Sequence, residues 1–216
     1  MLVFAKSQVL RGGLLSSLLF SLIILAQTQA RAQSPPLTPT NPNSFYKPIT
    51  GSERVKWTIR STIGPQSLAA GVLSAGWGTA FNSPEEYGTN WDGFAKRYGM
   101  RLTGVSTGNA IEASAGMLWG EDPRYFPAKK THFMGRVTHA ADLTFRTRDS
   151  NGNLKPAYAR YAGNVGNNFL SNTWRVESES SVESALTRIV LGFAGKFGSH
   201  LFEEFWPSVR RKIKLP

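Results

Sequence analysis

Glycines recur at intervals of four residues in the middle of the chain. The positions are Gly104, Gly108, Gly116 and Gly120. Glu112 occupies the gap in this series, and on an α-helix all five positions share one face. Glycine inside a helix costs about 0.5–1 kcal/mol relative to alanine, so we expect close packing to compensate. The pattern predicts a smooth groove that holds a second helix, with Glu112 buried beside Arg124, Arg136 or another arginine.

Apolar residues at spacings of three and four predict helices through the rest of the chain. The expected ranges are 52–63, 66–81, 93–119, 131–148, 160–174 and 178–205. Ser52 is the expected cap of the first helix, Gly99 a point where the long third one breaks, and Pro207 the end of the last. The fold class that follows is all-α: a glycine-rich bundle of about five to six helices over residues 50–207.

One segment leaves two alternatives open. Residues 149–153, Asp-Ser-Asn-Gly-Asn, form the clearest turn signal in the chain. The turn joins either two short strands, 143–148 and 154–158, as a β-hairpin, or a helix and a loop.

The N-terminus has the organisation of a secretory signal peptide. Lys6 and Arg11 precede an uncharged apolar run, Leu14 to Ala26, and Ala30-Arg31-Ala32 offers a cleavage site. The run is too short for a typical membrane span. We therefore expect a signal peptide over residues 1–32, a disordered Pro-rich tether over 33–49 and a basic tail over 208–216. The protein is expected to be exported to the periplasm or the outer-membrane-associated envelope of a Gram-negative-type bacterium.

Charge narrows the class of partner. The chain has 25 Lys and Arg against 14 Asp and Glu, and residues 33–216 keep a net charge of +8. Such a surface favours anionic partners, and for an exported protein these are an anionic membrane or envelope polymer rather than nucleic acid. The chain has no cysteine, which excludes disulfides and thiol chemistry. We predict no cofactor, and self-association through glycine-faced helices as a further mode of interaction.

A catalytic alternative rests on one motif. Gly104-Val105-Ser106-Thr107-Gly108 matches G-x-S-x-G, the nucleophile elbow of α/β-hydrolases. That elbow requires a strand before the first glycine, and the sequence there continues at helical spacing. The enzyme alternative is an envelope hydrolase that uses Ser106 with His200, or Glu112, Glu121 and Asp122 as acid and base. We favour the helical interpretation and no catalytic residue.

Two further groups are candidates for binding. Arg124 and Tyr125 lie in Glu121-Asp122-Pro123-Arg124-Tyr125-Phe126, which is either a ligand clamp or a helix-ending turn fixed by Arg–carboxylate bonds. His132, His139 and Asp142 do not form a full metal ligand set, so no metal site is predicted.

The C-terminal end carries the membrane hypothesis. Trp206 is followed by the basic residues Arg210, Arg211, Lys212 and Lys214, which could contact headgroups and phosphates. The alternative is that Trp206 packs on the core and the tail is solvated.

Three segments resemble those of a family of exported bacterial proteins of acidobacterial type. They are Glu85-Glu86-Tyr87-Gly88, Trp119-Gly120 with the EDPRYF motif that follows, and Glu204-Phe205-Trp206-Pro207. The similarity covers most of residues 57–206. It implies export and a shared fold, and it transfers no catalytic residue. The expected function is that of a non-enzymatic envelope structural or interaction protein, peripherally membrane-associated.

Overall fold

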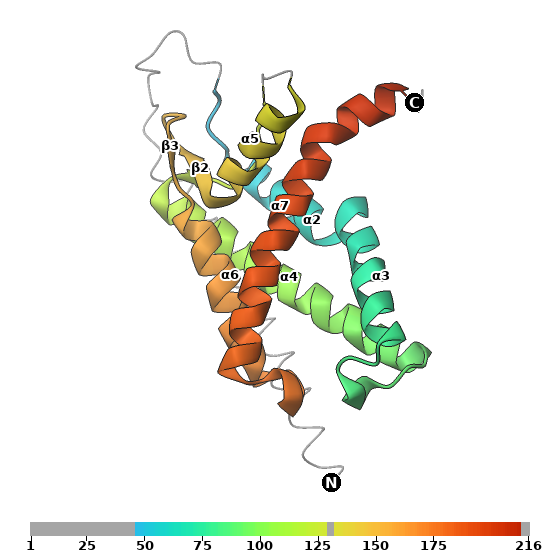
Figure 1. Ribbon diagram of the computed structural model, residues 1–216. Coiled ribbons are helices and arrows are strands. Elements are labelled where there is room, and N and C mark those ends of the chain that lie inside the picture. Colours follow the sequence, from blue (N-terminus) through green and yellow to red (C-terminus); the bar gives the residue numbers. More distant parts are fainter. Residues whose placement is uncertain (1–45, 129–131, 213–216) are drawn as a thin grey trace.

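The computed structural model describes residues 46–128 and 132–212, without the side chain of Lys212. The expected signal peptide and residues 33–45 of the expected tether lie outside these ranges. The described part is an all-α fold with one small sheet, as predicted (Figure 1). Its α-helices are α2 Gly51–Ile63, α3 Pro65–Ala80, α4 Trp91–Trp119, α5 Phe133–Phe145, α6 Tyr158–Leu170 and α7 Val182–Lys212. Three short 3-10 helices are η1 Glu85–Tyr87, η2 Ser171–Thr173 and η3 Glu177–Glu179.

The first helix begins at a capping box. Thr50 Oγ1 accepts the backbone N–H of Glu53 at 3.3 Å, and the Glu53 carboxylate accepts the Thr50 N–H at 2.8 Å. The cap is therefore Thr50 and not Ser52, because only Thr50 has the matching acid three residues later. α2 ends at Ile63 with Gly64 as its C-cap, and Pro65 opens α3, where proline costs no helical hydrogen bond.

α4 is a single continuous helix of 29 residues. Gly99 does not break it, since the residues on both sides keep their helical hydrogen bonds. Gly120 does not extend the groove either. It caps the helix in the left-handed conformation (φ 66°), which glycine adopts without strain. The groove thus ends at Gly116.

The predicted groove is real and α6 fills it. A Cβ added to Gly163 of α6 would lie 2.8 Å from the Gly108 carbonyl oxygen and 3.2 Å from the Glu112 nitrogen. At the end of the groove, a Cβ on Gly116 would lie 2.8 Å from Arg54 Nη1. The glycines therefore allow backbone-to-backbone approach of α4 and α6 within one chain. The partner of Glu112 is Arg160 of α6, not Arg124 or Arg136.

The hairpin is the correct alternative. β2 Arg146–Asp149 pairs antiparallel with β3 Leu154–Pro156 around Gly152, whose φ is 85°. The strands are shorter than expected because α5 continues to Phe145. A third strand, β1 Glu121–Asp122, pairs with β2 and was not predicted, since two residues carry no periodicity.

α7 runs through Pro207 and ends at Lys212, so the expectation that Pro207 stops the helix is wrong. Proline removes one helical donor and crowds the preceding turn. Arg136 of α5 braces this point, since it donates to the Glu204 carbonyl and to Ser208 Oγ, at 3.4 Å for the latter. The first residues of the expected basic tail are therefore helical.

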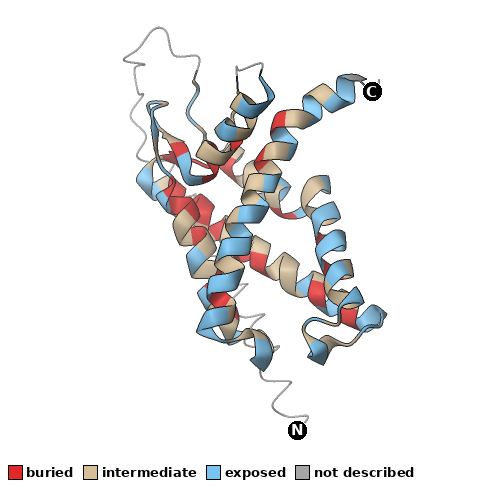
Figure 2. Cartoon of the chain, viewed as in Figure 1, coloured by how far each residue is buried: buried red, intermediate tan, exposed pale blue. Residues whose placement is uncertain are grey.

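The described part buries small and charged side chains and exposes large apolar ones; Figure 2 shows where the buried and exposed residues lie along the chain. Among the described residues, the buried apolar side chains are seven alanines and Leu143. Buried charged side chains are Arg54, Arg97, Glu112, Glu121, Asp122, Arg160 and Glu204. Large apolar side chains lie outside: Leu73 is 75% exposed, Trp77 70% and Val190 67%. No helix within residues 46–128 and 132–212 is long and apolar enough to cross a membrane.

Candidate functional site

The buried polar interior centres on Glu112, between α4, α6 and α7. Arg160 Nε donates to Glu112 Oε1 at 3.0 Å, and Lys196 Nζ of α7 lies 3.5 Å from Oε2. Burial alone would raise the pKa of Glu112, but the charges of Lys196 and Arg160 outweigh it and hold that pKa below its usual range. Burial lowers the pKa of Lys196, against the attraction of Glu112. The Glu112 carboxylate is thus held by the Arg160 guanidinium and the Lys196 amino group.

Arg160 also connects the end of α5 to this cluster. Its Nη1 donates to the Leu143 carbonyl at 2.5 Å and to the Thr144 carbonyl at 3.1 Å, both in the last turn of α5. Orphan carbonyls at a helix C-terminus favour a cation. A single buried guanidinium therefore links α4, α5 and α6.

Glu121 and Asp122 lie at the start of the sheet and are both almost fully buried. Glu121 Oε2 accepts the Ala159 N–H at 2.9 Å in the first turn of α6, where a carboxylate favours the helix dipole. Glu121 Oε1 has no hydrogen-bond partner among the described residues, and Lys155 Nζ lies 3.7 Å from it. The Glu121 carboxylate thus caps the N-terminus of α6 and balances the charge of Lys155 in the hairpin.

Asp122 is held by Arg124 and by Tyr46. Arg124 Nη2 and Nε donate to the carboxylate at 2.6 and 3.0 Å, and Tyr46 Oη donates at 2.9 Å. Arg124 also donates to the Lys47 carbonyl at 2.8 Å. The Tyr46 pKa is raised, chiefly by desolvation and then by the Asp122 charge. These contacts fix the end of the expected tether to the hairpin.

Tyr125 belongs to a third cluster, around Glu204 of α7. Glu204 accepts Tyr125 Oη at 2.7 Å, Arg136 Nε at 2.6 Å and the Ala128 N–H at 2.9 Å. Desolvation works against ionisation of Glu204, but these donors hold its pKa below the usual range. Arg124 and Tyr125, adjacent in sequence, therefore serve two different carboxylates.

His200 is buried beside this cluster. Its Nδ1 lies 3.2 Å from Thr144 Oγ1, and its ring stacks on Tyr125 with centroids 4.7 Å apart. Desolvation, with the charges of Lys196 and Arg160, lowers its pKa to about 2. His200 is therefore neutral at physiological pH and, with so low a pKa, is a weak base.

Ser106 lies within α4, with helix on both sides. A nucleophile elbow needs a sharp turn between a strand and a helix, and this geometry is missing at Ser106. The space beside Glu112, Glu121 and Arg160 leaves no room for a water molecule. Glu112 and Glu121 line this space, whereas Ser106, which is partly buried, does not.

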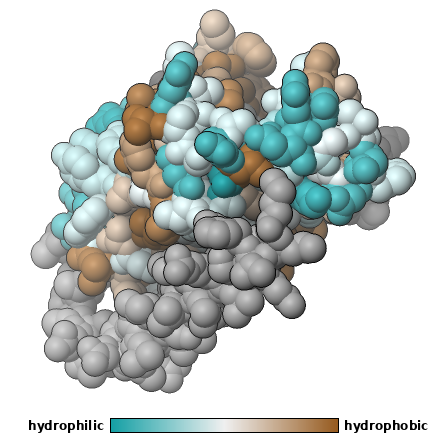
Figure 3. All heavy atoms as spheres, turned by 90° about the horizontal axis from the view of Figure 1, so that it is seen from below, coloured by the Kyte–Doolittle hydropathy of each residue, from teal (hydrophilic) through white to brown (hydrophobic). Residues whose placement is uncertain are grey.

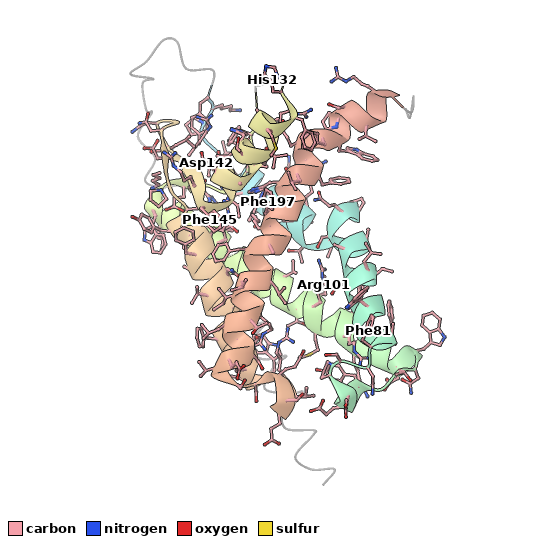
Figure 4. The ribbon with its side chains drawn as sticks, viewed as in Figure 1. Phe81, Arg101, His132, Asp142, Phe145 and Phe197 are labelled. Carbon is pink, nitrogen blue, oxygen red and sulfur yellow. The ribbon has the colours of Figure 1, made fainter. Side chains whose placement is uncertain are left out.

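Metal binding finds no support in the described part of the chain, which contains no cluster of three His, Asp or Glu side chains able to hold an ion. His139 Nε2 contacts the Phe126 carbonyl at 2.9 Å instead. His132 and Asp142 lie at different heights along α5 (Figure 4).

The last turns of α7 form the second candidate site. Phe202 and Trp206 stack with centroids 5.0 Å apart and are 42% and 39% exposed. Arg210 and Arg211 are exposed one turn further on. Lys212 follows in α7, while Lys214 lies outside the described residues. Aromatic and basic side chains thus share one exposed helix end.

Sequence reasoning missed the buried cations, above all Arg54, Arg97 and Arg160. Arg97, for example, donates to the carbonyls of Pro84 and Gly88 at 2.7 and 2.6 Å and closes the η1 loop. A basic residue in a helical pattern normally lies on the solvated face. The burial of Arg97 could have been inferred from its position. It shares a helix face with Gly93, four residues before it, and Gly104, seven residues after it.

No family model, curated protein or solved structure matches this chain. The chemistry of the two sites is therefore the basis for the function.

Proposed function

We propose that this chain is an exported, non-enzymatic protein of the bacterial cell envelope, a structural or interaction module held at an anionic membrane surface. The observation that carries the proposal is the end of α7, where Phe202 and Trp206 stack on the exposed side and basic residues follow directly. Aromatic rings favour the headgroup region, and Arg and Lys favour lipid phosphates.

The carboxylates support the non-enzymatic part of the proposal. Glu112, Asp122 and Glu204 each contact at least one guanidinium, and Glu121 caps α6 beside Lys155. A general acid or base must reach a reacting group. Since these side chains are buried and engaged in bonds between elements, their charges hold the fold together.

Vesicle flotation tests membrane association. The full chain is expected to float with phosphatidylglycerol vesicles at low salt, and less with phosphatidylcholine vesicles or at high salt. A variant with Arg210, Arg211, Lys212 and Lys214 all changed to Gln should lose most of the anionic preference. Failure to bind anionic vesicles at any salt concentration would refute the proposal.

The matched control removes equal charge elsewhere. Lys47, Lys56, Arg60 and Lys96 are exposed outside the α7 end, and changing all four to Gln lowers the net charge by the same amount. This variant should keep more anionic binding than the α7 variant. Equal loss in both would show that overall charge, and not the α7 end, directs binding.

A further inference from the structure

We propose that the outward faces of α3, α6 and α7 contact the acyl chains of a lipid membrane. This inference rests on the proposed membrane association and gives it a mode: hydrocarbon contact in addition to headgroup charge. On both α3 and α7 the large apolar side chains lie on the exposed side of the helix.

α3 has no charged residue, and its small side faces inward. Gly71 and Ala75 are buried, and a Cβ on Gly71 would lie 2.8 Å from the Tyr98 ring. Its large residues point outward, with Leu73 75% and Trp77 70% exposed. In water this arrangement forgoes about 25 cal/mol for each Å² of apolar surface left exposed. In hydrocarbon it does not.

α7 shows the same inversion over a longer distance. Lys196 and His200 turn inward, while its exposed side carries Leu186, Val190, Leu191, Ala194, Gly195, Gly198, Phe202, Trp206 and Val209. From Leu186 to Val209 these apolar positions extend roughly 35 Å along the helix, interrupted by the exposed Glu203. A Cβ added to Gly195 or Gly198 would meet no atom within 4 Å, so this face has no partner within the described chain.

The direction of the faces favours lipid over a second copy of the chain. α3 and α6 lie on opposite sides of α7 in Figure 1, and exposed apolar residues occur on all three, including Val165 and Phe169 of α6. Phe81 and Phe145 lie on opposite sides of the molecule in Figure 4 and are 64% and 50% exposed. A single partner chain would cover one patch, whereas acyl chains can contact several faces at once.

Exposed charges gather away from these faces. The connections before α4 and α7, at the lower end of Figure 1, carry Glu85, Glu86 and Glu177, and the first turns of these helices carry Asp92 and Glu183. The hairpin and the end of α7, at the upper end, carry Arg146, Arg210 and Arg211. Lys56, Arg60 and Glu203 are exceptions between the two ends. Seen from below, hydrophobic residues reach the surface at several places beside hydrophilic ones (Figure 3).

Spin labelling tests the proposal, because the chain has no native cysteine. Single changes Leu73→Cys, Val165→Cys and Val190→Cys place a nitroxide on α3, α6 and α7 at exposed positions that tolerate it. Thr89→Cys and Asn151→Cys are matched controls in exposed polar connections. Each full-length variant is reconstituted in phosphatidylglycerol vesicles, and accessibility to oxygen and to nickel-EDDA is measured.

In hydrocarbon, the three helix labels should be severalfold more accessible to oxygen than to nickel-EDDA, and the two controls the reverse. Helix labels that nickel-EDDA reaches as easily as the controls would overturn this inference while leaving headgroup binding intact. Labels shielded from both reagents would show a protein interface and would equally overturn it. Helix labels that are more accessible to oxygen than to nickel-EDDA, together with equal flotation on anionic and neutral vesicles, would refute only the proposed headgroup attraction.

Discussion

Arg160 on α6 and Glu112 on α4 meet through a 3.0 Å hydrogen bond inside the groove that the glycines create. Both side chains are almost fully buried. The glycines allow the two backbones to approach, and the ion pair fixes how the helices are aligned along the groove. Removing one partner from such a pair leaves an uncompensated charge.

Glu112→Gln is therefore expected to lower the free energy of unfolding by about 3–5 kcal/mol, since Arg160 and Lys196 lose their counter-ion. Chemical denaturation followed by circular dichroism measures this change. Asp92→Asn is the matched control, because Asp92 and Lys96 form an exposed pair whose loss costs at most about 1 kcal/mol. Equal effects of the two substitutions would contradict a structural role for the Glu112 cluster.

Two glycine-to-alanine substitutions should change the stability of the protein in opposite directions. Gly163→Ala forces a methyl group against the Gly108 carbonyl and should destabilise the protein by about 1–3 kcal/mol. Gly195→Ala meets open space and should stabilise α7 by about 0.5–1 kcal/mol, the helix preference of alanine. Thermal unfolding of both variants checks the pair. If Gly163→Ala were also stabilising, α4 and α6 could not pack as closely as described.

Stability should fall as the pH drops below about 6.5. The pKa of His200 is lowered to about 2 by burial, so the unfolded chain takes up a proton that the folded chain refuses. The loss amounts to at most about 1.4 kcal/mol per pH unit between those two values. The lowered pKa values of Glu112 and Glu204 act in the same direction below about 4.5.

His200→Gln isolates the first of these terms. Between pH 6.5 and about 4.5 its unfolding free energy should change less with pH than that of the parent chain. Denaturant titrations at several pH values measure both slopes. Parallel slopes would mean that His200 is not the group that titrates.

Ser106 should behave as an ordinary helical residue. Because it lies within α4 and not on a strand-to-helix turn, a fluorophosphonate probe should leave it unlabelled. Ser106→Ala should give the same labelling as the parent chain. Labelling that disappears in Ser106→Ala would establish the hydrolase alternative.

The sequence predicted the location of the helices well, because apolar residues at spacings of three and four indicate a helix. This holds whether the apolar face is buried or exposed. It did not predict which face lies inside. Ile59 and Ile63 belong to an i, i+4 stripe that suggests a core, yet they are 51% and 54% exposed. The glycine series gave the better signal, because steric room is needed only where backbones meet.

The candidate sites were predictable only in part. The ion pair of Arg124 with Asp122 could be predicted, because residues two positions apart can form a local pair. The partners of Glu112 and Glu204 lie 48 and 68 residues away, and no local pattern links them. The aromatic and basic residues at the end of α7 were evident from the sequence. The continuation of the helix past Pro207 was not, because Arg136, which contacts this turn, lies far away in the sequence.

Cell fractionation tests the central claim, an interior of paired charges surrounded by an apolar exterior at a membrane. The full chain, expressed with its own N-terminal segment, is expected in the envelope membrane fraction. It should stay there after a high-salt wash and be released by detergent. Recovery in the soluble fraction, or complete release by salt alone, would contradict the account.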